Sequence, residues 1–382
     1  MRLEVMPGVA RTWVVLAVSI AAGLGGVTKV PQGQWPGLQP PTWYWSPVFS
    51  PDGKWIAFHG TVRGNMEIFR CRPDGSELRN LTRHSPGVDR DPLWSPDGRF
   101  ILFQSERTGE ADVYRMTAEG SEVTNLSRDP IHDADARWSP DGSSVLFWRA
   151  TPEYRMRDAQ RTLSKFRKPE LVIVGADGSA QRVLTAEAGE ANWSPDGKWI
   201  VFQRPEKKKG VTWLIRPDGS EEHKLFDGHA LAWTPDGKAL VAWPLGSFVR
   251  VAAAAHEENA QTRTLLEGYM VGSWSFALDP SLLWDPSHSR IAVAVQRQLG
   301  AQNRNGIVIL DRQGAVIADL RENGNQYEYG GQLSWSPDGE TIAFSYRPAW
   351  PVKAADYRGG IFTMRADGSD RVNIVPDGTE VE

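Results

Sequence analysis

The stretch Trp94-Ser95-Pro96-Asp97-Gly98, followed by the apolar run Phe100-Ile101-Leu102-Phe103, decides the fold of this 382-residue chain. Proline presets φ for the second position of a type I turn, aspartate tolerates the third, and glycine takes the left-handed position that closes a hairpin. The stretch therefore predicts a strand that ends at Trp94, a tight turn, and an antiparallel partner strand.

The same turn recurs along the chain with an aromatic residue before it. Ser-Pro-Asp-Gly occurs five times, Thr-Pro-Asp-Gly stands at 234–237, and a degraded copy reads Asp285-Pro286-Ser287-His288. The preceding aromatic residues are Phe49, Trp94, Trp138, Trp193, Trp233, Trp284 and Trp335. A second turn, often Asp-Gly-Ser, follows in most units, so each unit is expected to hold four short strands, A to D.

Successive copies stand 40 to 55 residues apart. Repeats of this length with four strands are typical of propeller blades. The predicted fold is all-β: a seven-bladed β-propeller of four-stranded antiparallel blades, with six or eight blades as the alternative. The large aromatic residue that ends each strand A is expected to fill the wedge between neighbouring blades.

A Trp-Ser-Pro-Asp-Gly turn followed by Ile-Ala-Phe, as at 335–344, resembles the repeat of the TolB-type, WD40-like propellers. The resemblance covers roughly residues 43–376. It implies a single propeller domain with blades that start near 43, 88, 132, 187, 227, 278 and 329, and a tail at 377–382. TolB has an α/β domain ahead of its propeller, which the short segment before residue 43 leads us not to expect here. Because the first unit opens with strand A and the last ends with a D-like strand, we expect closure without strand exchange.

The N-terminal residues predict export. Arg2 and Arg11 precede an apolar run, Trp13 to Leu24, which is shorter than the roughly 20 apolar residues of a membrane span. Residues 1–25 are therefore interpreted as a signal peptide or, uncleaved, as an N-terminal anchor, and residues 26–42 as a linker. A periplasmic or secreted protein is predicted, attached to a membrane only through this segment.

Composition excludes several functions. The 43 basic and 47 acidic residues give a net charge of −4, so nucleic acid is not expected as a partner. The one cysteine rules out an internal disulfide framework and a Cys-rich metal site. The chain contains neither a Gly-x-Ser-x-Gly nucleophile elbow nor a His-Glu-x-x-His zinc motif. No catalytic residue is predicted, and a monomer without a cofactor is expected.

The third unit carries an insertion between strands B and C. The chain takes 25 residues from Trp94 to Glu119 but 39 from Trp138 to Asp177. Residues 151–169 are rich in Arg and Lys, and Ala159, Leu163 and Phe166 fit the spacing of a short amphipathic helix. B–C loops and D–A connections emerge on one face of an up-and-down blade, so this face is the predicted binding face. Its predicted partner-binding residues are Arg155, Arg157, Arg161, Lys165 and, from an insertion in the seventh unit, Trp350; the alternative is a solvated loop with incidental charge.

Carboxylates precede strand A on the same face. Asp89 and Asp133 stand five residues before the aromatic position, and Asp91, Asp135 and Glu190 stand three before it. Because strand A is innermost in a propeller, these groups are expected near the mouth of the central channel. They would receive a basic peptide, cap the turn backbone, or hold Ca²⁺, for which Asp91, Asp135 and Glu190 are the candidates.

The sequence thus predicts an exported, non-catalytic scaffold that binds a protein or peptide partner, for example in the cell envelope, through this face. Carbohydrate is the second class of partner. The rival prediction is a metal-dependent, carbohydrate-active enzyme that resembles polysaccharide lyases and uses acidic and His loops on the same face. Its histidines would be His84, His132 and His229, which lie at unequal distances before their aromatic residues.

Overall fold

The computed structural model describes residues 43–379, apart from 63, 84, 158–159, 207–208, 244–248, 254–261, 267–269, 272–283, 300–301, 321–326 and 349–358. The predicted leader (1–25), the predicted linker (26–42), His84 and Trp350 lie outside the described residues. Among the residues described, none belongs to a helix long and apolar enough to cross a lipid bilayer.

The strands pair in sequence order into seven four-stranded sheets, which are numbered here one to seven along the chain. Sheets one to three contain β1 (Tyr44–Phe49), β2 (Ile56–Val62), β3 (Asn65–Cys71), β4 (Arg79–Asn80); β5 (Asp89–Trp94), β6 (Phe100–Ser105), β7 (Asp112–Thr117), β8 (Thr124–Asn125); and β9 (His132–Trp138), β10 (Ser144–Arg157), β11 (Gln160–Gly175), β12 (Arg182–Ala186). Sheets four and five contain β13 (Gly189–Trp193), β14 (Ile200–Glu206), β15 (Lys209–Ile215), β16 (His223–Asp227); and β17 (His229–Trp233), β18 (Ala239–Trp243), β19 (Val249–Ala253), β20 (Thr262–Leu266). Sheets six and seven contain β21 (Met270–Val271), β22 (Arg290–Leu299), β23 (Gln302–Asp311), β24 (Val316–Asp319); and β25 (Tyr327–Trp335), β26 (Thr341–Pro348), β27 (Gly360–Arg365), β28 (Val372–Pro376).

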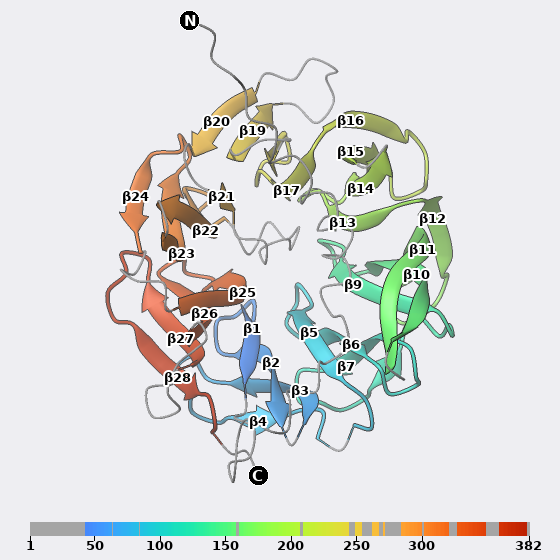
Figure 1. Ribbon diagram of the computed structural model, residues 1–382, viewed down its shortest axis with the longest axis horizontal. Helices are drawn as coiled ribbons and strands as arrows, with labels where there is room; N and C mark the ends of the chain where they lie inside the picture. The colour runs from blue at the N-terminus through green and yellow to red at the C-terminus, as the bar shows by residue number, and fades with distance from the viewer. Residues whose placement is uncertain are drawn as a thin grey trace, which may run out of the picture.

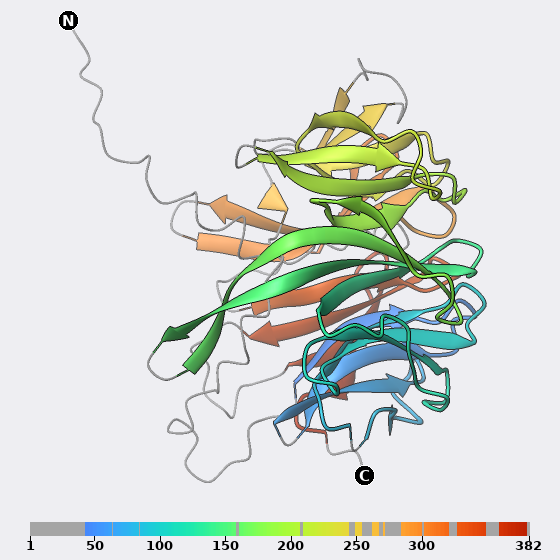
Figure 2. The same ribbon diagram turned by 90° about the vertical axis from the view of Figure 1, so that its right-hand side faces the viewer.

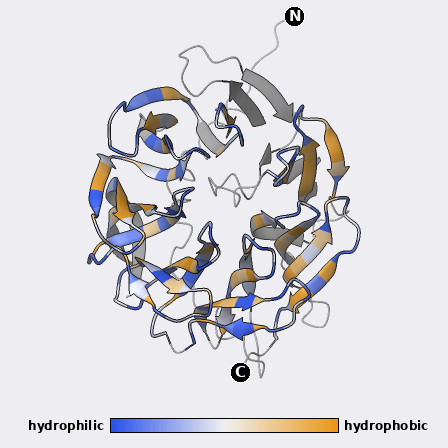
Figure 3. Ribbon diagram, turned by 180° about the vertical axis from the view of Figure 1, so that it is seen from behind, coloured by the Kyte–Doolittle hydropathy of each residue, from blue (hydrophilic) through white to orange (hydrophobic). Residues whose placement is uncertain are grey.

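The sheets stand around a common centre, with the first strand of each sheet innermost and the fourth outermost (Figure 1). Apolar residues lie along the strands, whereas hydrophilic residues gather at the connections (Figure 3). The prediction of an all-β propeller built from four-stranded antiparallel blades is confirmed.

Side-chain hydrogen bonds hold the repeated turn. Ser50 Oγ donates to Asp52 Oδ1 at 2.7 Å and accepts the backbone N–H of Trp55 at 3.0 Å, while Gly53 has a φ of 70°. In the degraded copy, Asp285 Oδ1 accepts the backbone N–H of Arg290 at 2.8 Å and thus replaces the serine oxygen. His288 takes the glycine position with a φ of 59°. The sixth turn therefore keeps its geometry without its glycine.

The aromatic residue at the end of strand A fills the wedge between neighbouring sheets, as predicted. Trp94 packs with Val48 and Ile68 of the preceding sheet, and its Nε1 donates to the Val48 carbonyl at 3.1 Å. The aromatic residues that occupy such inter-sheet clusters are Phe49, Trp94, Trp138, Trp193, Trp233 and Trp335.

The first and last sheets meet without exchanging a strand, which confirms the predicted mode of closure. The Phe49 backbone N–H donates to Ser334 Oγ at 3.0 Å. The hydroxyl of Tyr44 donates to the carbonyl of Thr379 at 2.9 Å, so the end of the described chain also contacts β1.

The helix predicted within residues 151–169 is wrong. Strand β10 continues to Arg157 and β11 starts at Gln160, with Tyr154 opposite Leu163 and Arg157 opposite Gln160. A short helix would need a costly new nucleus, whereas each residue added to an existing hairpin gains a partner at once. The ribbon projects beyond the rest of the ring on one face (Figure 2).

Candidate functional site

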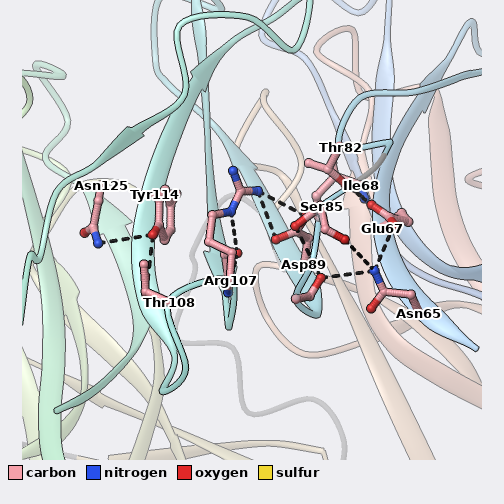
Figure 4. Close-up of polar contacts among 12 residues, drawn as sticks. Asn65, Glu67, Ile68, Thr82, Ser85, Asp89, Arg107, Thr108, Tyr114 and Asn125 are labelled. Atoms are coloured by element: carbon pink, nitrogen blue, oxygen red, sulfur yellow. Dashed lines mark hydrogen bonds and ion pairs between the residues drawn. The ribbon is translucent and has the colours of Figure 1, made fainter. Parts of the chain in front are cut away.

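The carboxylates Asp89 and Asp133 are buried in ion pairs within their own sheets. Arg107 Nη2 lies 3.1 Å from both carboxylate oxygens of Asp89, and Arg107 Nε donates to Ser105 Oγ at 2.8 Å (Figure 4). Arg149 Nε donates to Asp133 Oδ1 at 2.7 Å, and its Nη2 donates to Oδ2 at 3.1 Å. Both carboxyl groups have no exposed surface. They stabilise the start of strand A and are not presented to solvent.

A second buried layer of polar side chains, which is not among the sites predicted from the sequence, lies beside these ion pairs. Glu67 on β3 accepts hydrogen bonds from Thr82 Oγ1 at 2.6 Å and Asn65 Nδ2 at 2.9 Å (Figure 4). One sheet on, Asp112 accepts a bond from Ser127 Oγ at 2.9 Å. The repeat in the sequence that could have revealed this layer is an acidic residue at the start of strand C together with a Leu-Thr or Leu-Ser at the end of strand D.

Asp91, Asp135 and Glu190 share a backbone role. Each lies in a β-bulge of strand A with positive φ, at 55°, 52° and 28° respectively, and Ser46 takes the same place in sheet one with a φ of 53°. Aspartate and asparagine tolerate this left-handed region better than most residues. The three-residue spacing therefore has a conformational cause: it marks the bulge that redirects the innermost strand.

The residues at these bulges contact groups of neighbouring strands through the backbone or the side chain. The backbone N–H of Asp91 donates to His59 Nδ1 at 3.2 Å, which joins sheets one and two. Asp135 Oδ2 accepts a bond from Trp148 Nε1 at 2.6 Å. Burial, reinforced by the charge of Asp135, raises the pKa of Glu190 to about 7. Glu190 is thus a carboxyl group that changes charge near neutral pH.

The two histidines of this face whose side chains the structure describes, His59 and His132, are poor acid–base groups at neutral pH. Burial lowers the pKa of His59, and burial together with the nearby charge of Arg90 lowers the pKa of His132 to about 4. Within the described part of the chain, no three His, Cys, Asp or Glu side chains come together as ligands for a metal ion. The calcium candidates Asp91, Asp135 and Glu190 stand on β5, β9 and β13, the innermost strands of three successive sheets.

The basic residues predicted to bind a partner fall on the projecting ribbon. Arg155 and Arg157 lie on β10, and Arg161 and Lys165 lie on β11. Residues 151–168, called the arm below, extend past the last pairs that β10 and β11 make with β9 and β12. The arm separates these residues from the channel-mouth carboxylates, so the structure describes two distinct features on one face.

A cavity of about 540 Å³, which no sequence motif predicts, opens at the opposite end of the channel. The repeated turns line it mainly with proline and with the edges of the strand A aromatic residues. Its carboxylate, Asp285, is held by its own turn and by Arg290 Nε at 3.0 Å. This cavity has the size of a small-ligand pocket and a mostly apolar lining, to which Arg137 and His288 add two basic side chains.

Comparison with known proteins places this architecture in a family. The sequence profile of the TolB beta propeller domain matches residues 40–236, slightly more than half of the chain. The chain belongs to the TolB beta propeller domain family.

Individual matches define how far this likeness reaches. An uncharacterized protein of Agrobacterium fabrum is 44% identical over 41 residues, which is 11% of this chain and 14% of that protein. An oligogalacturonate lyase from Vibrio parahaemolyticus is similar over 79% of this chain and 86% of its own, with a TM-score of 0.58 and 14% identity. A puromycin-hydrolyzing peptidase of Mycobacterium tuberculosis is similar over 89% of this chain, with a TM-score of 0.63 and 14% identity, but the match spans only 54% of the peptidase. At these identities the two structures show a shared fold and nothing about activity.

Proposed function

We propose that this TolB-like propeller is a non-catalytic scaffold that binds a protein or peptide partner through the face of the B–C and D–A connections. The observation that carries the proposal is the arm, because a two-stranded ribbon that leaves its sheet adds surface without adding to the core of the domain. Its position on a rigid ring is typical of binding elements, which commonly stand on loops held by a stable scaffold.

The chemistry of the described residues also favours binding over catalysis. The most deeply buried carboxylates on the face, Asp89 and Asp133, pair with Arg107 and Arg149, and burial keeps His59 and His132 neutral. General acid–base catalysis needs groups poised near the working pH and within reach of a substrate. Glu190 has such a pKa, as do Glu67 at about 7 and Asp133 at about 6, but Glu67 and Asp133 are buried in hydrogen bonds and an ion pair.

The finer architecture and the location of the protein belong to the same proposal. We infer that the seven sheets are the seven blades of one closed ring. Residues 1–25 direct export and are either cleaved or kept as an anchor, which places the scaffold in the periplasm or outside the cell. N-terminal sequencing of the protein recovered from each cell fraction tests this location, and recovery of intact protein only from the cytosol would contradict it.

The test compares the full chain with an arm-replaced variant, in which a Gly-Asn-Gly-Ser loop stands for residues 151–168. Each is crosslinked in extract of the source organism, and the captured proteins are quantified by mass spectrometry. The proposal expects at least one saturable partner that the full chain captures and the arm-replaced variant loses, with equal unfolding midpoints for the two chains. Identical captured sets would refute the role of this face.

A separate assay addresses the rival enzyme. The purified chain is incubated with oligogalacturonate and Mn²⁺, and unsaturated products are followed by their ultraviolet absorbance. The scaffold proposal expects no absorbance increase above the rate of a protein-free control. Turnover that is lost on chelation of the metal would overturn the proposal.

A further inference from the structure

The arm exposes strand edges that nothing in the described structure covers. β9 pairs with β10 only as far as His132 opposite Ala150, and β12 pairs with β11 only as far as Ala186 opposite Glu170. Beyond those pairs, Thr151–Arg157 and Gln160–Arg167 pair with each other. In the described ranges, no third strand lies beside either of them. An uncovered edge presents a row of N–H and C=O groups, which is a template for an added strand.

The two edges of the arm are not equivalent. The β10 edge contains Pro152, which has no N–H to offer and is typical of an edge protected against pairing. The β11 edge, Gln160–Arg167, contains no proline, so every residue keeps its backbone donor. The register shift between Glu153 and Tyr154 leaves Ser164 of β11 without an opposite residue, so a bulge divides the β11 edge into Gln160–Leu163 and Lys165–Arg167. The free edge of β11 lies on the same side of the strand as β12, which pairs with Glu170–Ile173 of β11. A strand added at this edge would therefore belong to the same sheet.

The net charge of the arm determines which kind of ligand the β11 edge would attract. Residues 151–168 contain six basic residues (Arg155, Arg157, Arg161, Lys165, Arg167, Lys168) and two acidic ones (Glu153, Asp158), a net charge of +4. The whole chain carries −4, so the basic charge is concentrated here. A second arm from another copy would place like charges side by side, which opposes pairing. An acidic segment is attracted to the same edge.

We propose that the β11 edge of the arm binds an extended acidic segment of a partner protein by adding it to sheet three as a further strand. The inference rests on the proposed scaffold function and specifies its chemistry. Main-chain hydrogen bonds would supply the contact common to all ligands, and the acidic side chains would select the partner.

The test measures the binding of a labelled peptide, (Glu-Val)4, to the full chain by fluorescence anisotropy. The matched control peptide, Glu-Val-Glu-Pro-Glu-Val-Glu-Pro, keeps the four glutamates but cannot form a regular strand. We expect saturable binding of (Glu-Val)4, at least tenfold weaker binding of the proline peptide, and loss of binding in the arm-replaced variant. Equal affinity for both peptides, binding that survives replacement of the arm, or no binding of (Glu-Val)4 would each overturn strand addition. Binding to phosphatidylglycerol vesicles in place of the peptide would overturn it as well.

Two neighbouring substitutions on β11 test the edge itself. N–H groups alternate between the two sides of a strand, so one of Thr162→Pro and Leu163→Pro removes an outward donor and the other removes an inward one. We expect the outward variant to lose at least tenfold in affinity for (Glu-Val)4 without a change in the unfolding midpoint. Wild-type affinity in both variants would contradict the proposal. A partner that is still captured by both variants in extract would leave the scaffold function standing while strand addition falls.

Discussion

Replacing Glu190 with Gln should stabilise the protein at alkaline pH and change little at acidic pH. Glu190 lies on β13 in a bulge, where burial and the charge of Asp135 raise its pKa from 4.5 to about 7 against the opposing effect of Arg137. Between these two pH values, the folded chain holds a proton that the unfolded chain has released. This difference makes the folding free energy contributed by Glu190 less favourable as the pH rises through this window.

The size of the change in unfolding free energy follows from the difference between the pKa values of Glu190 in the unfolded and folded chains. A pKa difference from 4.5 to about 7 corresponds to about 3 kcal/mol of destabilisation once the pH exceeds the folded value. Glutamine resembles the neutral carboxyl in shape and does not ionise. The Glu190→Gln variant should therefore match the wild type below pH 4.5 and exceed its free energy of unfolding by about 3 kcal/mol at pH 8.

The assay is urea unfolding of both chains at intervals from pH 4 to pH 8. The difference between the two chains isolates Glu190, because the lowered pKa of His132 gives both chains a pH dependence of the opposite sign. Glu187→Gln, at an exposed position in the connection before β13, is the matched control and should follow the wild type throughout. A constant difference between Glu190→Gln and wild type across the whole pH range would refute the reasoning.

Three further predictions concern stability and use the same urea assay. Arg149→Met leaves the carboxylate of Asp133 buried without its partner and should cost about 3–5 kcal/mol, most of which the double variant with Asp133→Leu recovers; a single-variant loss below about 1 kcal/mol would contradict this. Gly98→Ala places a side chain at a φ of 70° and should cost about 1 kcal/mol, whereas His288→Gly relieves a φ of 59° and should gain a similar amount; reversed signs would show that the turns are not strained in this way. Trp94→Phe removes one hydrogen bond and should cost about 1 kcal/mol beyond the small loss of area, against about 3–5 kcal/mol for Trp94→Ala; equal losses would contradict the packing role of the indole.

The blade architecture could be predicted from the sequence because the turn that builds it is local. Ser50, Asp52 and Gly53 make their decisive contacts within six residues of chain, so the motif alone specifies the hairpin. The packing of Trp94 between two sheets is also predictable, because a large apolar residue at the end of each strand A is expected to be buried against the neighbouring sheet.

The candidate site was harder to predict because its meaning depends on contacts between distant residues. The sequence predicts that Asp89 stands just before the end of strand A, but its burial and its pairing with Arg107 depend on how the hairpin after β6 folds back. The three-residue spacing of Asp91 and Asp135 before the aromatic position is visible in the sequence, while the positive φ that explains it appears only in the structure. The helix predicted in the insertion of the third unit is wrong. Three apolar residues at helical spacing stabilise a helix less than the continued pairing of β10 with β11 stabilises a strand.

Photocrosslinking from single positions tests the binding face most directly. Benzoylphenylalanine replaces Thr162 on the arm in one chain and Ser143, an exposed residue in the turn on the opposite face, in another. After irradiation in extract of the source organism, the proposed function predicts a discrete crosslinked partner from position 162 and none from position 143. A discrete partner from position 143, with none from position 162, would contradict it.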